Sequence, residues 1–364
     1  MTDERPYSPG LEGIVAAETS LGYVDGERGQ LLYRGYRIGD LVEHGTYPAV
    51  ANLLWTGDWT PGHHLPTGPL PDAVLTTLRA LPGNAAPMDA LRTAVSAWGS
   101  TQELKWPPTP DQARALTSFS PSALAAFARI RRGQDPIEPD PSLDLVPGFL
   151  YQLTGSKPDA GTARALDAYF MVGAEHGLNA STFTARVITS TQSDMASAVA
   201  GAIGALKGPL HGGAPSAVVE QIHEVGSVEK AEEWIRGKLD RHELLMGFGH
   251  RVYRAYDPRA AALRKVAESM EHPPDWLALA IAVEDVALRV LAEKHPERAL
   301  KTNVEFYAAP VLQGVGLTPD LFPATFALAR HAGWTAHIIE QAAANRIIRP
   351  ADRYIGPAER DLPG

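Results

Sequence analysis

Cysteine is absent from the 364 residues of this chain. Without a thiol, these residues can form no disulfide framework, no thiolate zinc site and no cysteine nucleophile. A basic excess is lacking as well, because 42 acidic side chains outnumber 33 lysines and arginines and leave a formal net charge of −9. This balance argues against nucleic acid or an anionic membrane surface as the main partner, since both require a large basic field.

Long apolar runs are also scarce. The stretch AVAGAIGAL at 198–206 is among the longest, and it covers about half of the ~20 residues that a membrane-spanning helix needs. The first ten residues, MTDERPYSPG, are polar and lack the apolar core of a signal peptide. We therefore expect a cytoplasmic protein.

Three motifs of common catalytic folds are missing too. The chain contains no Gly-x-Gly-x-x-Gly of a dinucleotide-binding fold, no Gly-x-Ser-x-Gly of a hydrolase and no His-Glu-x-x-His of a zinc protease. His176, His211 and His250 are the histidines that a metal site would use, but no local pattern of carboxylate partners accompanies them. We predict that the protein holds no metal and no tightly bound cofactor.

Two of these histidines stand among glycines. His211 lies in LKGPLHGGAP and His250 in LMGFGHRVYRAYDPR. Glycine allows unusual backbone angles and lets a ligand approach the main chain closely. Each histidine alone is compatible with a simple tight turn, but the three unusual histidines together indicate a pocket that uses imidazole chemistry.

An acid and several arginines complete a set of chemically useful groups. Glu305 lies in KTNVEFYAAP, between apolar and aromatic neighbours, where burying a carboxylate costs several kcal/mol unless something compensates it. Arg259, Arg330 and Arg349 carry planar guanidinium groups suited to bidentate binding of carboxylates. Such a set would serve proton abstraction next to a carbonyl while a dicarboxylate is held in place.

The helical pattern makes Arg330 unusual. After short strands around a Gly-Glu-Arg-Gly turn within 13–35, the sequence is mostly helical. Asp257-Pro258-Arg259 predicts a helix start with an acid as its cap, and Thr318-Pro319-Asp320 predicts the start of a long helix running to about Asn345. Arg330 falls on the stripe of this helix that should be buried, together with Phe326, Gly333 and His337. An arginine there must meet either a structural ion-pair partner or a bound anion, and the sequence leaves both open.

Several segments, in this order and at these separations, resemble the citrate synthase family. They are LKGPLHGG, GFGHRVYRAYDPR and NVEFY, supported by GQLLYRGYRIGDL, HGLNASTFTAR, FALARHAGWTAHIIEQ and IIRPADRYIGP. The likeness runs from about residue 10 to 357. It implies a mostly α-helical, two-domain homodimer with a short N-terminal β-hairpin. The large domain would comprise 1–207 and 312–364, and the smaller inserted domain 208–311.

The resemblance also implies a reaction, in which acetyl-CoA condenses with oxaloacetate to give citrate and free CoA. Glu305 would be the base that removes a methyl proton from the thioester. His211 would stabilise the enol, and His250 would polarise and protonate the oxaloacetate carbonyl. The oxaloacetate ligands would be His176, His250, Arg259, Arg330 and Arg349, the last donated by the other subunit. The CoA ligands would be Met246, Gly247, Phe248, Gly249, Arg254 and Asn303.

Two departures and two alternatives accompany this reading. Glu305 stands where most family members have aspartate, and the chain stops soon after IGPAERDLPG, which leaves the extent of a dimer arm undecided. A 2-methylcitrate synthase would differ only by accepting propionyl-CoA, and one extra methyl group changes binding by just about 1–3 kcal/mol. A non-catalytic sensor of CoA or a dicarboxylate on the same fold is the other alternative.

Overall fold

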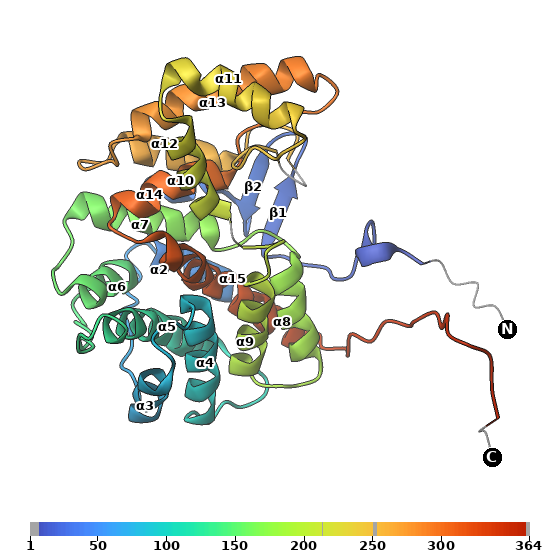
Figure 1. Ribbon diagram of the computed structural model, residues 1–364. Helices are drawn as coiled ribbons and strands as arrows, with labels where there is room; N and C mark the ends of the chain where they lie inside the picture. The colour runs from blue at the N-terminus through green and yellow to red at the C-terminus, as the bar shows by residue number, and fades with distance from the viewer. Residues whose placement is uncertain (1–6, 213, 250–252, 362–364) are drawn as a thin grey trace.

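The computed structural model describes residues 7–212, 214–249 and 253–361. Within these ranges the chain forms fifteen α-helices, two short 3-10 helices and one three-stranded sheet. The prediction of a mostly helical fold with a small N-terminal hairpin is therefore confirmed (Figure 1). No helix in the described part of the chain is long and apolar enough to cross a membrane.

The sheet forms around the predicted turn. Strands β1 (Gly22–Asp25) and β2 (Gln30–Tyr33) pair antiparallel, with Gly22 opposite Tyr33, and β3 (Tyr36–Arg37) adds a third antiparallel strand. Gly29 closes the turn with a φ of +62°, a left-handed conformation that glycine adopts readily. The carbonyl of Gly26 accepts a hydrogen bond of 2.8 Å from the backbone N–H of Arg254, so the hairpin tip supports a loop that carries predicted site residues.

Ten helices make up the larger body of the molecule, the lower part of Figure 1. They are α1 (Ile38–His44), α2 (Tyr47–Thr56), α3 (Asp72–Ala80), α4 (Pro87–Ser100), α5 (Pro110–Ile130), α6 (Leu145–Thr154), α7 (Ala160–Gly173), α8 (Ala180–Ser190), α9 (Met195–Leu206) and α15 (Phe322–Ala343).

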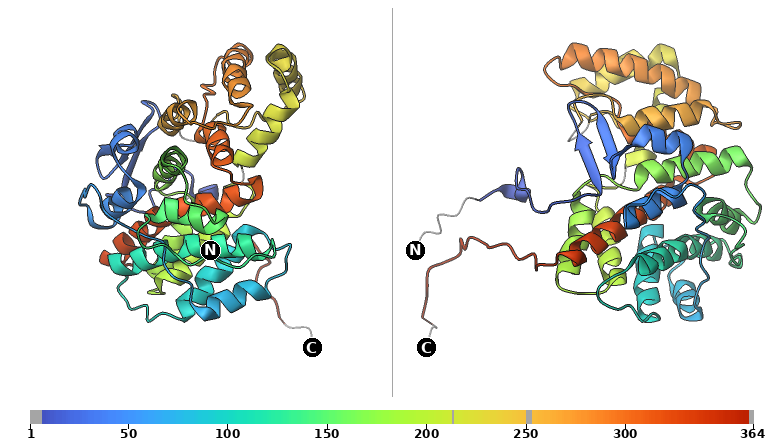
Figure 2. Two further views of the ribbon diagram at one scale, coloured as in Figure 1. Left: turned by 90° about the vertical axis from the view of Figure 1, so that its left-hand side faces the viewer. Right: turned by 180° about the vertical axis from the view of Figure 1, so that it is seen from behind.

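Five further helices gather at the other end. They are α10 (Ala214–Val225), α11 (Val228–Asp240), α12 (Pro258–Glu268), α13 (Leu277–Lys294) and α14 (Val304–Gly314). Helix α11 packs on α13 and α12 on α14, while α12 and α14 also contact α7 of the body. The views from the side and from behind show the same grouping (Figure 2). Helices α10 to α13 fall within the predicted small domain, and α14 extends beyond its predicted end. The boundaries at 208 and 311 stay a prediction.

Helix α15 runs through the body and is buried on nearly every side from Phe322 to Ile338. It contacts α2, α4, α5, α7, α8 and α9. The prediction that it begins at Thr318 is wrong, because a 3-10 turn, η2 (Pro319–Leu321), comes first. The hydroxyl of Thr318 bonds the side chain of Asp320 instead of capping a backbone N–H. Polar side chains on this enclosed helix must find partners inside the protein.

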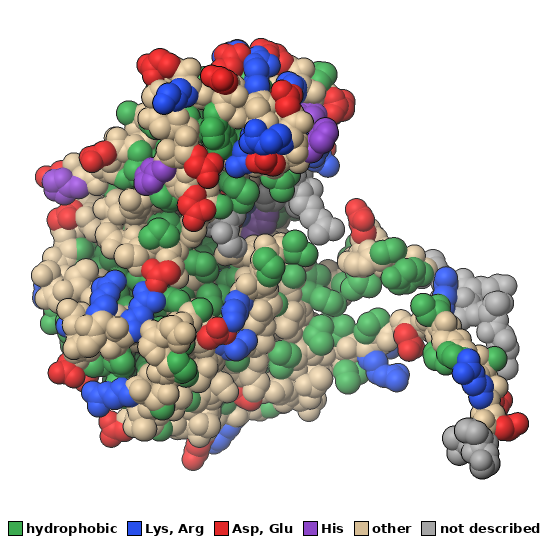
Figure 3. Space-filling view, in the orientation of Figure 1, with side chains coloured by type: hydrophobic (Ala, Val, Ile, Leu, Met, Phe, Trp, Pro, Cys, Tyr) green, Lys and Arg blue, Asp and Glu red, His purple; other side chains and the backbone are tan. Residues whose placement is uncertain are grey.

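The two chain ends leave the helical body on the same side. The N-terminal segment, which contains η1 (Pro9–Leu11), and the segment after Ala343 both extend away from it in Figures 1 and 2. In the space-filling view, a hollow opens between the body and the upper helices (Figure 3). This hollow lies between the two groups of helices that carry the predicted site residues.

Candidate active site

Four predicted site residues, Arg259, Glu305, His211 and His176, sit at helix ends and turns. Arg259 and Glu305 lie in the first turns of α12 and α14, whereas His211 lies in the turn between α9 and α10. His176 follows α7, and Arg330 lies in the middle of α15. Burial raises the pKa of Glu305 and the charge of Arg259 partly offsets this rise, whereas burial and then the charge of Arg330 lower the pKa of His211. These groups, distant in sequence, therefore act on one another through space.

Glu305 is held at the start of α14 by Asn303. The Asn303 side-chain oxygen accepts a 3.0 Å hydrogen bond from the backbone N–H of Glu305, and the Asn303 amide nitrogen donates to the Gly249 carbonyl at 2.8 Å. The carboxyl is half-buried. Burial raises the pKa of Glu305 to about 7, although the nearby Arg259 charge lowers it. A carboxyl that titrates near neutral pH suits a general base.

The loop Met246–Gly249 packs directly on this helix start. Gly247 has a φ of +84°, and a Cβ added there would lie only 2.8 Å from the ring of Phe306. Its carbonyl accepts a 2.9 Å bond from the Asn303 N–H. Asn303 thus links the predicted CoA-binding loop to the predicted base. His250, which follows this loop and was predicted to be catalytic, lies outside the described residues.

His211 is oriented by Ser181, at the start of α8. The backbone N–H of Ser181 donates to Nε2 of His211 at 3.2 Å, and the Ser181 hydroxyl is 2.9 Å from the same nitrogen. A backbone amide can only donate, so Nε2 is unprotonated and the ring proton resides on Nδ1. Burial, and then the charge of Arg330, lower the pKa of His211. The ring is thus a neutral N–H donor.

Arg259 is buried, with 4% of its surface exposed, and binds Asp257 through two nitrogens. Its Nε and Nη2 donate to the two Asp257 carboxylate oxygens at 3.1 and 2.8 Å. Burial acts to lower the pKa of Arg259, but Asp257 more than offsets it and the net pKa is raised. Asp257 also accepts the N–H of Val304 at 3.2 Å. The sequence indicated Asp257 only as a helix cap; its role in orienting this arginine was missed.

Arg330 differs sharply from Arg259. It is 3% exposed, yet its Nε and Nη1 atoms have no hydrogen-bond partner within the described ranges. The ring of Phe326 lies 5.2 Å from its Cζ. Burial lowers the pKa of Arg330, while Glu175 acts to raise it. A buried guanidinium without its own ion pair is costly, so of the two open interpretations the structure favours anion binding.

His176 joins this group through Tyr253. Its Nε2 is 3.3 Å from the Tyr253 hydroxyl, and the Tyr253 ring lies 5.8 Å from the Cζ atom of Arg259. Nothing in the sequence had singled out Tyr253, whose only signal was its place within the segment VYRAYDPR. A continuous series of contacts therefore connects His176, Tyr253, Arg259 and Asp257.

Two predicted residues lie away from this cluster. Arg349 is exposed on the segment that leaves the body, and its contribution to a second subunit stays a prediction. Arg254 is exposed and lines a cavity of about 870 Å³ together with Phe248, Gly249 and Arg298. This cavity adjoins the predicted CoA loop.

A second carboxylate that the sequence did not single out supports two segments of the site, residues 256–257 and residues 302–305. Glu284 of α13 is fully buried. It accepts hydrogen bonds from Thr302 at 2.5 Å and Tyr256 at 2.8 Å, and it binds Arg264 and Tyr307 as well. Thr302 precedes the Asn303–Glu305 segment and Tyr256 precedes Asp257, so one acid ties the two loops together.

No group of three or more histidine or acidic side chains in the described part of the chain is arranged to hold a metal ion. The chemistry available from the described residues is that of one base titrating near neutrality, one neutral N–H donor and two buried arginines. Such an arrangement can bind an anion, remove a proton from a carbon acid and stabilise the resulting enol.

Comparisons of the sequence and of the structure with known proteins identify relatives from one family. A family model described as "Citrate synthase, C-terminal domain" matches residues 10–351. The chain is 41% identical to a citrate synthase of Haloferax volcanii, covering 97% of this chain and 96% of that protein. It is 39% identical to a 2-methylcitrate synthase of Mycobacterium tuberculosis, covering 100% and 94%. It also resembles the solved citrate synthase of Thermoplasma acidophilum in ternary complex with carboxymethyl coenzyme A and oxaloacetate, with TM-score 0.87, 30% identity and 98% coverage of both chains.

Proposed function

Because the chain belongs to the citrate synthase family and is thus an acyltransferase, we propose that it condenses acetyl-CoA with oxaloacetate and water to give citrate and free CoA. The observation that carries this proposal is Glu305, a half-buried carboxyl with a pKa of about 7 at the start of α14. The methyl group of a thioester is a weak carbon acid, so its base must be partly desolvated and its developing oxyanion must meet a fixed donor.

The first step is enolisation. The Glu305 carboxylate removes a proton from the acetyl methyl group, and the C–H electron pair forms the enol double bond. The thioester oxygen gains electron density and takes a hydrogen bond from Nδ1–H of His211, whose Nε2 is held by Ser181. Because burial and the charge of Arg330 lower the pKa of His211, the ring is neutral and carries a single N–H. This N–H is the donor that the thioester oxygen needs.

Oxaloacetate provides the electrophile. Arg259 and Arg330 hold its carboxylates with His176, and Arg349 of a second copy completes the set in a homodimer. The enol carbon attacks the ketone carbon of oxaloacetate and forms the new C–C bond. His250, outside the described residues, supplies the proton to the ketone oxygen. Water then cleaves the citryl thioester, releasing citrate and the CoA thiol.

CoA is a cosubstrate in this scheme and no tightly bound cofactor is required. Met246, Gly247, Phe248, Gly249, Arg254 and Asn303 hold it, and the cavity beside the loop lies close enough to receive part of it. The small domain, 208–311, closes on the body, which excludes water during enolisation and admits it for hydrolysis. The reaction takes place in the cytoplasm, which cell fractionation tests.

The experiment is release of the CoA thiol from acetyl-CoA, measured with and without oxaloacetate, combined with identification of citrate as product. We expect thiol release only when oxaloacetate is present. Folded protein that binds oxaloacetate but releases no thiol would replace this proposal with the sensor function.

A second candidate rests on the relative from Mycobacterium tuberculosis named 2-methylcitrate synthase. The two activities share every step and differ by one methyl group in the acyl pocket. Parallel measurement of kcat/KM with acetyl-CoA and propionyl-CoA distinguishes them. A higher value with propionyl-CoA would assign the chain to 2-methylcitrate formation.

A further inference from the structure

The turn after α7 lies directly against α15, one helical turn from Arg330. Gly333 makes this approach possible: a Cβ there would lie 2.1 Å from the Ala174 carbonyl and 2.8 Å from Oε2 of Glu175. Any side chain at Gly333 would displace this turn. The Glu175 carboxylate therefore packs against α15 at Gly333, which lies between Arg330 and His337.

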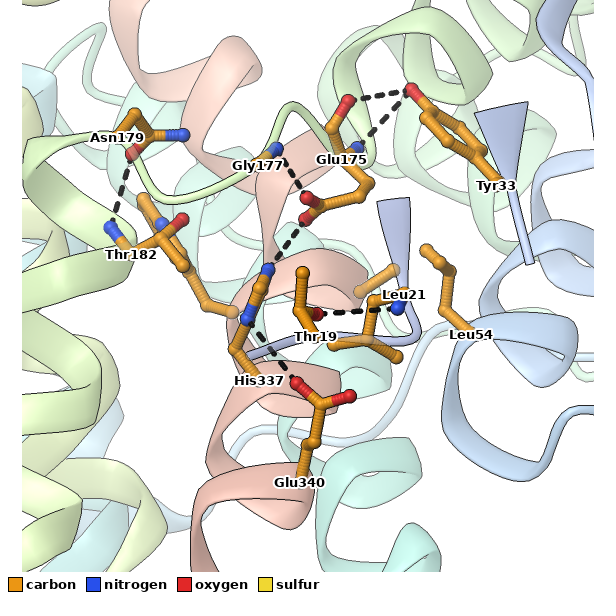
Figure 4. Close-up of polar contacts among 12 residues, drawn as sticks. Thr19, Leu21, Tyr33, Leu54, Glu175, Gly177, Asn179, Thr182, His337 and Glu340 are labelled. Carbon is orange, nitrogen blue, oxygen red and sulfur yellow. Dashed lines mark hydrogen bonds and ion pairs between the residues drawn. The ribbon is translucent and has the colours of Figure 1, made fainter. Parts of the chain in front are cut away.

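Glu175 is fully buried and immediately precedes His176. The backbone N–H of Gly177 donates to its Oε1, and Nε2 of His337 lies 3.2 Å from its Oε2, off the ideal line of a hydrogen bond (Figure 4). The Tyr33 hydroxyl of β2 donates to the Glu175 carbonyl at 2.8 Å. The Glu175 side chain thus ties the turn after His176, and the Tyr33 hydroxyl holds the main chain just before it.

The protonation of His337 follows from Arg186 of α8. Nε of Arg186 donates to Nδ1 of His337 at 3.0 Å. A guanidinium can only donate, so Nδ1 is an acceptor and the single ring proton lies on Nε2, on the side of Glu175. Arg186 in turn forms an ion pair with Glu340, whose other oxygen accepts the Ser20 N–H at 2.8 Å.

The pKa of Glu175 responds to these same contacts. Burial acts to raise the pKa of Glu175, but His337, Arg330 and the Gly177 N–H together lower it below its usual range. The converse effect is seen at Arg330, where Glu175 is the foremost group that raises the pKa. Glu175 and Arg330 therefore each favour the charged form of the other.

We propose that Glu175, in contact with His337, is a positioning residue for the dicarboxylate: it fixes the His176 turn against α15, one helical turn from the buried Arg330, before substrate binds. The inference rests on the proposed function, because it assigns oxaloacetate to His176 and Arg330. Glu175 does not touch the substrate in this scheme. It acts through its two neighbours.

The decisive variant is Glu175→Gln. The Gly177 N–H donates to one carboxylate oxygen, and Nε2 of His337 faces the other at 3.2 Å. An amide offers only one acceptor oxygen and must turn its NH₂ toward one of these two groups. We expect KM and Kd for oxaloacetate to rise roughly tenfold, while KM for acetyl-CoA stays within about twofold. Calorimetric binding of oxaloacetate measures Kd without turnover.

His337 variants test the same contact independently and serve if Glu175→Gln does not fold. His337→Gln keeps one N–H and one acceptor, and we expect it to retain oxaloacetate affinity within about threefold. His337→Leu removes both and should match the loss in Glu175→Gln. Asp167→Asn, which removes a different buried acid, on α7 itself, is the control for general destabilisation and should leave oxaloacetate KM unchanged.

The outcomes distinguish a failure of the proposed function from a failure of the role assigned to Glu175. Wild-type protein that neither binds oxaloacetate nor releases CoA overturns the proposed function itself. Suppose instead that the wild type is active, and that Glu175→Gln and His337→Leu lose thermal stability as Asp167→Asn does but keep normal oxaloacetate affinity. The proposed function then stands. In that case Glu175 is a purely structural acid and the inference is wrong.

Discussion

The backbone N–H of Ser181 and Nε2 of His211 are 3.2 Å apart, and this one hydrogen bond determines which ring nitrogen carries the proton. Ser181 starts α8 and His211 follows α9, so the contact depends on how these two helices pack. It leaves Nδ1–H as the donor available to a thioester oxygen.

This relationship predicts a specific kinetic effect. His211→Ala removes the enol-stabilising donor and should lower kcat by about 10²–10³, the usual effect of losing one oxyanion donor, with oxaloacetate KM little changed. Ser181→Ala keeps the backbone N–H and removes only the hydroxyl, so we expect a smaller effect. Steady-state kinetics on both variants checks the order. An equal loss in the two would show that the hydroxyl, not the amide, orients the ring.

The pKa of about 7 at Glu305 predicts a pH dependence. The base acts only when ionised, so kcat/KM for acetyl-CoA should fall about tenfold per pH unit below pH 7 and level off above it. Glu305→Gln should abolish turnover and leave oxaloacetate binding nearly intact. Profiles of kcat/KM between pH 5 and 9, with calorimetry on the variant, measure both. An inflection near the ordinary glutamate pKa, or near-normal turnover in Glu305→Gln, would rule out a desolvated Glu305 as the base.

The raised pKa of Glu305 also makes the stability of the folded protein depend on pH. The folded-state pKa of Glu305 lies above the unfolded value of about 4.3, so between these two values the folded state binds more protons than the unfolded state. This group's contribution to stability therefore decreases as pH rises from about 4 to 7 and stays low above pH 7. Glu305→Gln should raise Tm at pH 8 but not at pH 4, which differential scanning calorimetry can measure. A variant less stable than wild type at pH 8 would contradict a costly buried charge.

The unpaired guanidinium of Arg330 predicts a selective loss of binding. Arg330→Met should weaken oxaloacetate binding by about 2–4 kcal/mol, since a buried charge contact is lost, and should change the stability of the free protein less, because Nε and Nη1 of Arg330 have no hydrogen-bond partner among the described residues. Arg92→Met, at an exposed ion pair with Asp89, is the control. Calorimetric titration and thermal melting separate the two effects. Unchanged oxaloacetate affinity would return Arg330 to a structural role.

Glu284 and its neighbour Asp285 form a natural comparison. Glu284→Ala leaves Arg264 and three hydroxyl groups without their shared acceptor, and we expect a loss of stability on the order of 3–5 kcal/mol. Asp285→Ala removes an exposed acid one position away and should have little effect. Denaturant unfolding measures both. Similar values for the two variants would show that the buried cluster contributes little.

Local sequence signals predicted those features that depend on neighbouring residues. The Gly-Glu-Arg-Gly turn and the Asp257-Pro258 helix start were found because turn and cap preferences act within a few residues. The start of α15 was wrong for the same kind of reason: Thr318 has the correct residue type for a cap, but its hydroxyl bonds Asp320. Residue type shows what a side chain is able to do, not which of several partners it takes.

The sequence by itself determined the family, the helical class and the chemical groups available, because these depend on residue types and on the spacing of motifs along the chain. Only the tertiary structure decided the charge and proton state of those groups. Arg259 meets Asp257 while Arg330 meets no carboxylate among the described residues, and His337 receives its hydrogen bond from Arg186, about 150 positions away. Burial and partner identity set pKa and tautomer, and both arise from contacts between segments that the linear sequence keeps apart.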